Sequence, residues 1–132
     1  MCILFLIIGD ESHPTIICSN RDEYLTKPTN RGSVTENGNT FTPIDQVGGG
    51  SWLSFSGLNE KRLKFAVVLN FDYWRQAKAK PINEALLKSR GLLIKDFMEC
   101  NIESDVYARD IFDKRAEYRP FNLIVGKWLF HT

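Results

Sequence analysis

The sequence predicts an α+β fold built on antiparallel sheets, and three observations lead to this prediction. Short runs rich in β-branched and aromatic residues fill much of the first 70 positions. Apolar residues then recur at helical spacing between residues 81 and 114. Another strand-like run follows near the end of the sequence. Strands gathered in blocks, rather than alternating one by one with helices, indicate an α+β fold with layered antiparallel sheets.

Length and composition fit a single domain spanning residues 1–132. A hydrophobic content of 43% and a charged content of 25% are typical of a soluble globular protein with its own core. The formal net charge of +1, with no run of lysines or arginines, argues against a nucleic-acid partner. Three widely spaced cysteines predict a reducing compartment rather than a disulfide framework.

The N-terminal segment predicts a β-hairpin. Residues 2–8 (CILFLII) form an apolar run typical of a buried strand. This run is too short to span a membrane and lacks the basic flank of a secretory signal. A second run rich in β-branched residues covers 15–19. With the turn near residue 10, antiparallel pairing is expected to set Cys2 opposite about Ser19.

The middle of the chain predicts loops followed by strands. Residues 24–39 are expected to be loop-rich, with a tight turn at Asn37-Gly38. The run Gly48-Gly49-Gly50 predicts either a flexible turn or a close approach by another backbone or a ligand. Strands are expected at 40–42, 51–56 and 63–70, the last two pairing as a hairpin.

Helical spacing dominates the next part of the chain. Apolar residues from Ile82 to Met98 predict helix, with either a break or a new helix beginning near Gly91. A second helix is expected at 104–114, with Ser104 as its N-cap. The remaining predictions are a surface loop at 71–80, a strand at 121–125, a turn at 126–127 and a new strand from 128.

Cys2 is the residue with the most distinctive chemistry. Removal of the initiator Met would leave its thiol as a nucleophile beside its own α-amine, whose pKa of about 7.7–8 suits a base at neutral pH. Arg21 would favour the thiolate, Asp22 would orient the amine, and Asn70 would donate an N–H to a developing oxyanion. The alternative is that Cys2 is a small core residue and that residues 20–23 form a solvated turn.

Other residue types predict little chemistry. The two histidines have no spaced Cys or His partner, so we expect no metal site. The glycine run lacks the Lys-Ser/Thr of a phosphate-binding loop, so we expect no bound nucleotide. Cys18 and Cys100 resemble core thiols, and a redox pair between Cys18 and Cys2 is the alternative for the former.

Several short motifs then occur in one order along the chain. They are Met1-Cys2-Ile3-Leu4, Ser19-Asn20-Arg21-Asp22-Glu23, Gly49-Gly50-Ser51-Trp52-Leu53, Leu69-Asn70, Lys88-Ser89-Arg90-Gly91 and Phe121-Asn122-Leu123-Ile124. With these motifs the chain resembles the NRDE-motif family, the Transport and Golgi organisation family, over essentially its whole length. The resemblance implies an N-terminal nucleophile hydrolase-like fold, a four-layer αββα sandwich, of which this chain would hold the N-terminal part. Such a part would leave apolar sheet faces uncovered.

For function, the resemblance implies a role in protein secretion and Golgi organisation and in lipid or haem trafficking, without catalysis. It implies a small-molecule ligand, namely a lipid, an acyl-CoA or haem, the last as transported ligand and not as cofactor. The expected location is the cytoplasm, with association with the Golgi or mitochondria, and no transmembrane segment is expected. The candidate binding residues are Asn20, Arg21, Glu23, Trp52, Arg90 and Asn122.

The alternative function is an amide or thioester hydrolase that depends on Cys2, with Asp22 and Asn70 as its other candidate catalytic residues. Hydrolases of the cholylglycine type, which share this architecture, carry an Arg-Asn-x-Asp cluster after their first hairpin. Here Asn20 and Asp22 match that cluster, but Ser19 stands at its Arg position and Arg21 falls between the two. The departure favours the non-catalytic interpretation.

Overall fold

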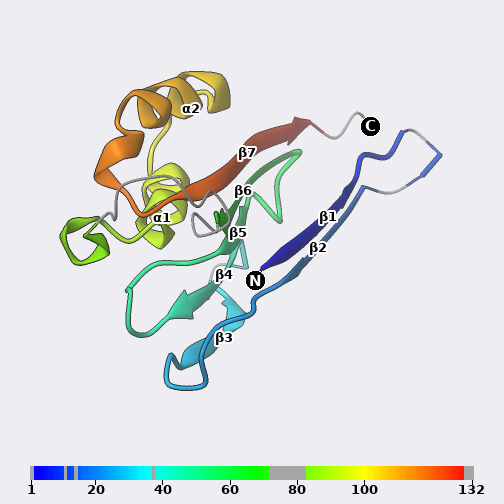
Figure 1. Cartoon of the computed structure of the whole chain (residues 1–132). Coiled ribbons are helices and arrows are strands. Elements are labelled where there is room, and N and C mark those ends of the chain that lie inside the picture. The colour runs from blue at the N-terminus through cyan, green and yellow to red at the C-terminus, as the bar shows by residue number, and fades with distance from the viewer. Residues whose placement is uncertain (1, 11, 14, 37, 72–82, 130–132) are drawn as a thin grey trace.

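The computed structural model of the chain describes residues 2–10, 12–13, 15–36, 38–71 and 83–129 (Figure 1). Among them are seven strands and two α-helices, so the predicted α+β fold class is confirmed. The elements are β1 (Ile3–Ile7), β2 (Ile16–Asn20), β3 (Thr29–Val34), β4 (Thr40–Asp45), β5 (Leu53–Ser56), β6 (Arg62–Asn70), α1 (Gly91–Glu99), α2 (Ser104–Asp113) and β7 (Phe121–Leu129). Short 3₁₀ turns lie at Glu84–Leu86 and Arg115–Glu117.

The strands form two separate antiparallel sheets. Strands β1 and β2 make a two-stranded sheet, and β3 to β7 make a five-stranded sheet in chain order. Helix α1 packs on β5 and β6, and α2 packs on β7. Figure 1 shows both helices on one side of the five-stranded sheet and the β1–β2 hairpin on the other. The four-layer sandwich implied by the family resemblance stays a prediction.

The N-terminal hairpin is confirmed, but its register differs from the prediction. Leu4 pairs with Ser19, so the expectation that Cys2 lies opposite Ser19 is wrong by two residues. The reason is that the midpoint between the paired strands falls one residue later in the sequence than the predicted turn. Since strand side chains alternate with a period of two, a two-residue shift leaves each side chain on its expected face. Extended by one position, the observed register sets Cys2 level with Arg21.

One face of this hairpin contradicts the prediction of a buried strand. Side chains of β1 alternate between half-buried and exposed, and Phe5 is 67% exposed. No described residue covers this outer face. Cys18 is exposed there, opposite Phe5, so it is not a core thiol. Cys2 lies on the other face, and this alternation rules out a Cys2–Cys18 pair.

Strand β3 was not predicted, because residues 24–39 were expected to be loops. It pairs with β4 across a register shift between Asn30 and Ser33. Most of its side chains are exposed, and it is an edge strand of the sheet. A polar edge strand shows no apolar alternation, so backbone pairing with β4 decides its structure. Strand β4 itself runs beyond its predicted end to Asp45.

The β5–β6 hairpin is confirmed, whereas the turn predicted at 126–127 is wrong. Strand β7 runs without interruption along β6, with Gly126 opposite Phe65. A Cβ atom at Gly126 would lie 2.5 Å from the Phe65 ring. The glycine therefore makes room for an aromatic side chain of the neighbouring strand. It does not turn the chain.

Both predicted helices are present, with corrections at their N-termini. Helix α1 begins at Gly91, so the alternative of a new helix there is confirmed. The N-cap of α2 is Glu103, not Ser104, and Ser104 Oγ is buried without a hydrogen bond in the described part of the chain. None of the described helices has the length and apolarity that a membrane span requires. The loop predicted at 71–80 lies, beyond Phe71, outside the described residues, as does Ile82.

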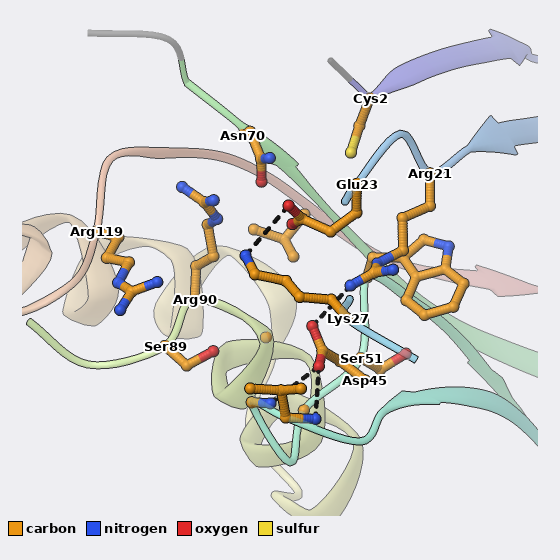
Figure 2. A pocket seen from close by; sticks show the side chains of 16 residues that line it. Cys2, Arg21, Glu23, Lys27, Asp45, Ser51, Asn70, Ser89, Arg90 and Arg119 are labelled. Carbon is orange, nitrogen blue, oxygen red and sulfur yellow. Dashed lines mark hydrogen bonds and ion pairs between the residues drawn. The ribbon is translucent and has the colours of Figure 1, made fainter. Parts of the chain in front are cut away.

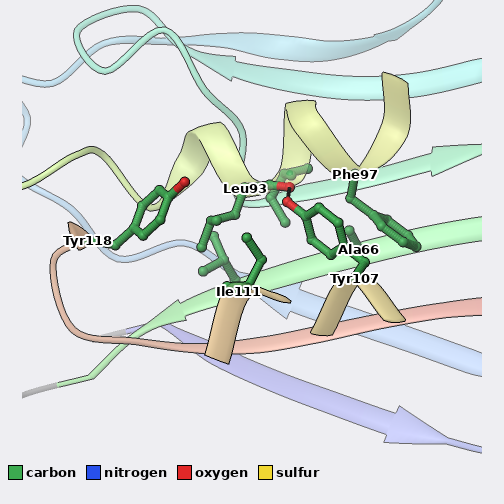
Figure 3. Close-up of a cluster of buried hydrophobic side chains, with 8 residues drawn as sticks. Ala66, Leu93, Phe97, Tyr107, Ile111 and Tyr118 are labelled. Atoms are coloured by element: carbon green, nitrogen blue, oxygen red, sulfur yellow. Dashed lines mark hydrogen bonds between the residues drawn. The ribbon is translucent and has the colours of Figure 1, made fainter. Parts of the chain in front are cut away.

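The core lies between the two helices and the interior strand β6 (Figure 3). The Tyr107 hydroxyl donates a hydrogen bond of 2.8 Å to the Leu93 carbonyl and so joins α2 to α1 within this core. Burial raises the pKa of Tyr107, so the hydroxyl keeps its proton. The buried cluster consists of Ala66, Val68, Leu93, Ile94, Phe97, Tyr107, Ile111 and Tyr118.

Candidate functional site

A cavity of about 190 Å³ lies where the N-terminal hairpin, the β4–β5 connection, the end of β6 and the start of α1 come together. Residues flanking the strands of the N-terminal hairpin, residues of the five-stranded sheet and the first residue of α1 line it. Six of the nine site residues predicted from the sequence are among them, namely Cys2, Arg21, Glu23, Trp52, Asn70 and Arg90.

The glycine run forms one wall of this cavity through a close backbone approach. A Cβ atom at Gly50 would lie 2.3 Å from the carbonyl carbon of Gly91. The Ser51 N–H donates a 3.1 Å hydrogen bond to the Gly91 carbonyl. Of the two interpretations of the run, close approach by another backbone therefore holds at Gly50. This contact brings the start of α1 to the cavity.

The Cys2 thiol, from the residue before β1, and the Asn70 carboxamide, from the end of β6, point into the cavity (Figure 2). The Cys2 Sγ–H donates to the backbone carbonyl of Asp22 across 4.0 Å. A backbone carbonyl can accept this hydrogen bond but cannot take the proton, so a nucleophilic Cys2 needs a separate base. Asp22 itself is exposed and does not line the cavity, so the structure offers its backbone to the thiol.

Arg21 is directed toward β4. Its Nη2 donates a 2.7 Å hydrogen bond to Asp45 Oδ2, and its guanidinium lies 4.9 Å from the centre of the Trp52 ring. The side chain is only 14% exposed, so this charge-assisted bond is well shielded from water. The contact ties the end of the N-terminal hairpin to the five-stranded sheet. A role of Arg21 in favouring the Cys2 thiolate stays a prediction.

Asp45 anchors this arrangement and was not singled out from the sequence. Its Oδ1 accepts hydrogen bonds of 2.9 Å from the N–H groups of Val47 and Gly48. Burial raises the pKa of the carboxyl group, but these two hydrogen bonds and the Arg21 charge outweigh burial and lower it. An Asp immediately before a glycine-rich turn is a recognisable signal for such a side-chain-to-backbone turn.

Two further basic residues of the cavity were also missed. Lys27 Nζ forms a 3.1 Å ion pair with Glu23, four residues earlier in the sequence. Arg119 lines the cavity next to the predicted residue Arg90, whose Nη1 donates a 2.8 Å hydrogen bond to the Pro120 carbonyl. Neither Lys27 nor Arg119 belongs to a sequence motif that would have indicated a site.

A second, larger cavity of about 1090 Å³ lies between α2 and the start of β7. The predicted binding residue Asn122 lines this cavity and not the one at Cys2. Asn20 is exposed and lines neither cavity. The apolar side chains of the larger cavity include Leu87, Ile111, Phe112, Tyr118, Phe121 and Leu123.

The fold and these sites define an α+β protein whose N-terminal hairpin brings a cysteine to a cavity rich in arginine. A profile of the family described as Transport and Golgi organisation 2 matches residues 1–131. The chain belongs to this family, and the resemblance predicted from the motifs is confirmed.

Two curated relatives cover nearly the whole chain. The Transport and Golgi organization protein 2 homolog of Homo sapiens is 26% identical over 96% of this chain. The corresponding homolog of Mus musculus is 24% identical over the same share. The chain spans 45% of the length of each of these proteins.

Proposed function

We propose that the chain serves protein secretion and Golgi organisation by binding a lipid, an acyl-CoA or haem without converting it. The larger cavity carries this proposal, because its volume of about 1090 Å³ and its apolar lining suit such a ligand. The smaller cavity at Cys2, about 190 Å³, has room only for a small polar group of such a ligand, such as a carboxylate. Membership of the family and the names of the relatives support the cellular role. We propose action in the cytoplasm, in association with the Golgi or mitochondria.

The surroundings of Cys2 support binding rather than catalysis. The thiol donates to a backbone carbonyl, which cannot remove its proton. The arginine of the NRDE motif, Arg21, forms an ion pair with Asp45 at 2.7 Å. A thiol whose hydrogen-bond acceptor is a backbone carbonyl suits the wall of a binding site.

Two exposed residues of α2 provide a matched test of the larger cavity. Phe112 lines it and is 63% exposed, whereas Val106 is 53% exposed and does not line it. Two ligands are tested on the intact chain. Binding of cis-parinaric acid is monitored by fluorescence, and binding of haemin is monitored by absorbance. Phe112→Gln should weaken binding about fivefold, corresponding to about 1 kcal/mol of lost apolar contact, and Val106→Gln should not.

The result that would overturn the proposal is equally direct. The proposal fails if neither ligand shows saturable binding, or if the two substitutions weaken binding equally. Circular dichroism of both variants checks that each keeps the secondary structure of the unmodified chain.

A Cys2-dependent amide or thioester hydrolase is the second candidate, and one observation favours it. The Cys2 thiol and the Asn70 carboxamide enter one cavity, as a nucleophile and an oxyanion donor would. This mechanism requires removal of Met1, because the free α-amine of Cys2 acts as the base. Intact-mass measurement of the purified chain tests that requirement, and a retained Met1 would exclude the mechanism.

A further inference from the structure

The outer face of the N-terminal hairpin is apolar and carries no charged residue. Figure 1 shows the hairpin on the side of the five-stranded sheet away from both helices. The large side chains of this face are well exposed, from 44% at Ile16 to 67% at Phe5, so no described residue covers them. The strand register sets three cross-strand pairs side by side on the face, namely Ile3 with Asn20, Phe5 with Cys18 and Ile7 with Ile16.

The area of this outer face suits a modest protein interface. The exposed parts of its four large apolar side chains amount to about 450 Å². Two such faces packed together would bury about 900 Å² of apolar side-chain surface, to which backbone and rim atoms add. Weak but specific interfaces bury a total of about 1,200 Å² or less. The face therefore has the area of a reversible dimer rather than of an obligate one.

The sequence of β1 is self-complementary, which points to a second copy of the chain as the occupant of this face. Residues Ile3–Ile7 read ILFLI in both directions. When a two-fold axis at Phe5 relates two antiparallel copies, Ile3 lies over Ile7 of the second copy, and Phe5 lies over Phe5. A two-fold dimer needs such a self-matching patch, because the same surface serves both partners.

The charges that flank the face disfavour a lipid surface as its occupant. Asp10 stands at the turn end of the hairpin, and Asp22 and Glu23 follow β2 at the other end. The basic residue between them, Arg21, forms an ion pair with Asp45. Cytoplasmic membrane surfaces are negatively charged, and a site for them carries basic residues. A second uncharged face meets no such repulsion.

We propose that two copies of the chain pack their N-terminal hairpins face to face, with the cross-strand pair of Phe5 and Cys18 of each copy at the two-fold axis. The side chains of packed sheets interdigitate across a spacing of about 10 Å. The two Cys18 thiols therefore face each other across the interface. This self-association goes beyond the proposed function and does not depend on a bound ligand.

Sedimentation velocity of the intact chain, at about 1–200 μM, tests the dimer. We expect the weight-average sedimentation coefficient to rise with concentration, as a Kd in the micromolar range requires. Phe5→Gln should raise the dimer Kd about 100-fold, because a two-fold axis makes each substitution count twice. The matched control Phe112→Gln removes a phenylalanine of α2 with nearly the same exposure, 63%, and should leave the Kd unchanged. Circular dichroism checks that both variants stay folded.

A short bismaleimide, which joins two thiols by adding each across a C=C bond, tests the geometry of the dimer. We expect a covalent dimer whose cross-linked peptide joins Cys18 to Cys18, and we expect Phe5→Gln to reduce its yield. Three outcomes would overturn the proposal: a monomer at every concentration, equal Kd values for Phe5→Gln and Phe112→Gln, or a dimer not linked through Cys18. Flotation of a monomeric chain with phosphatidylcholine vesicles would also overturn it and would assign the face to lipid.

Discussion

Replacing Asp45 by Asn should loosen the junction between the N-terminal hairpin and the five-stranded sheet. The carboxylate accepts one bond from the Arg21 guanidinium at 2.7 Å and two from backbone N–H groups at 2.9 Å. Asn keeps one acceptor oxygen but turns an N–H₂ group toward the guanidinium, so donor faces donor. Hydrogen bonds to a charged group contribute about 1.5–3 kcal/mol each, less where water reaches them.

Because the Asp45 side chain is 24% exposed, we expect a loss near the lower end, about 2 kcal/mol in the free energy of unfolding. For a domain of this size that corresponds to a fall of roughly 6–8 °C in Tm. Thermal unfolding followed by circular dichroism measures it. The control is Asp110→Asn on α2, which removes a 51% exposed ion pair with Lys114 and should cost less than about 0.5 kcal/mol.

The pH dependence of this difference has a defined sign. The pKa of Asp45 lies below its ordinary value of 3.8 in the folded protein. The folded state therefore holds its proton less tightly than the unfolded chain, and the stabilisation is complete above the unfolded pKa. It should disappear as the pH falls below about 4 through the folded pKa. A Tm difference no larger than that of Asp110→Asn, or one that persists unchanged in acid, would refute this reasoning.

Two further predictions concern backbone approach and the core. Gly50→Ala should lower the free energy of unfolding, measured with urea, by more than about 3 kcal/mol, because its Cβ would lie 2.3 Å from Gly91. Gly49→Ala is the control: its Cβ meets open space, but its φ of +67° is unfavourable for Ala, so we expect a loss of about 1 kcal/mol. Equal losses would contradict the contact at Gly50. Tyr107→Phe should lower the free energy of unfolding by about 1–2 kcal/mol, because it removes the hydroxyl that donates to the buried Leu93 carbonyl. An unchanged urea midpoint would contradict that hydrogen bond.

Elements with a strong apolar pattern could be predicted from the sequence, and those formed by tertiary pairing could not. Strand β6 has buried residues from Phe65 to Val68, which give it a clear signal. Strand β3 has none, since it is a polar edge strand held by β4. The turn expected at Gly126 failed for another reason: the glycine accommodates the Phe65 ring, a contact that local sequence does not contain.

The residues of the candidate site also fall into two groups, those that sequence motifs indicated and those that only the structure reveals. Motif order pointed to Cys2, Asn70 and Arg90, and the structure brings all three to one cavity. Asp45 and Arg119 line that cavity too, but their importance follows from what they approach in space. The two-residue error in hairpin register came from assigning the turn too early, and the alternation of strand side chains kept it from moving Cys2 to the wrong face.

One measurement separates binding from catalysis most directly. Palmitoyl-CoA is incubated with the intact chain. Its binding is monitored by tryptophan fluorescence, since Trp52 lines the cavity at Cys2. Free CoA in the same sample is quantified by chromatography. We predict saturable binding with no release of CoA above the protein-free control. Release of CoA that Cys2→Ser abolishes would contradict binding without conversion and show the hydrolase instead, and absence of binding would exclude acyl-CoA as the ligand.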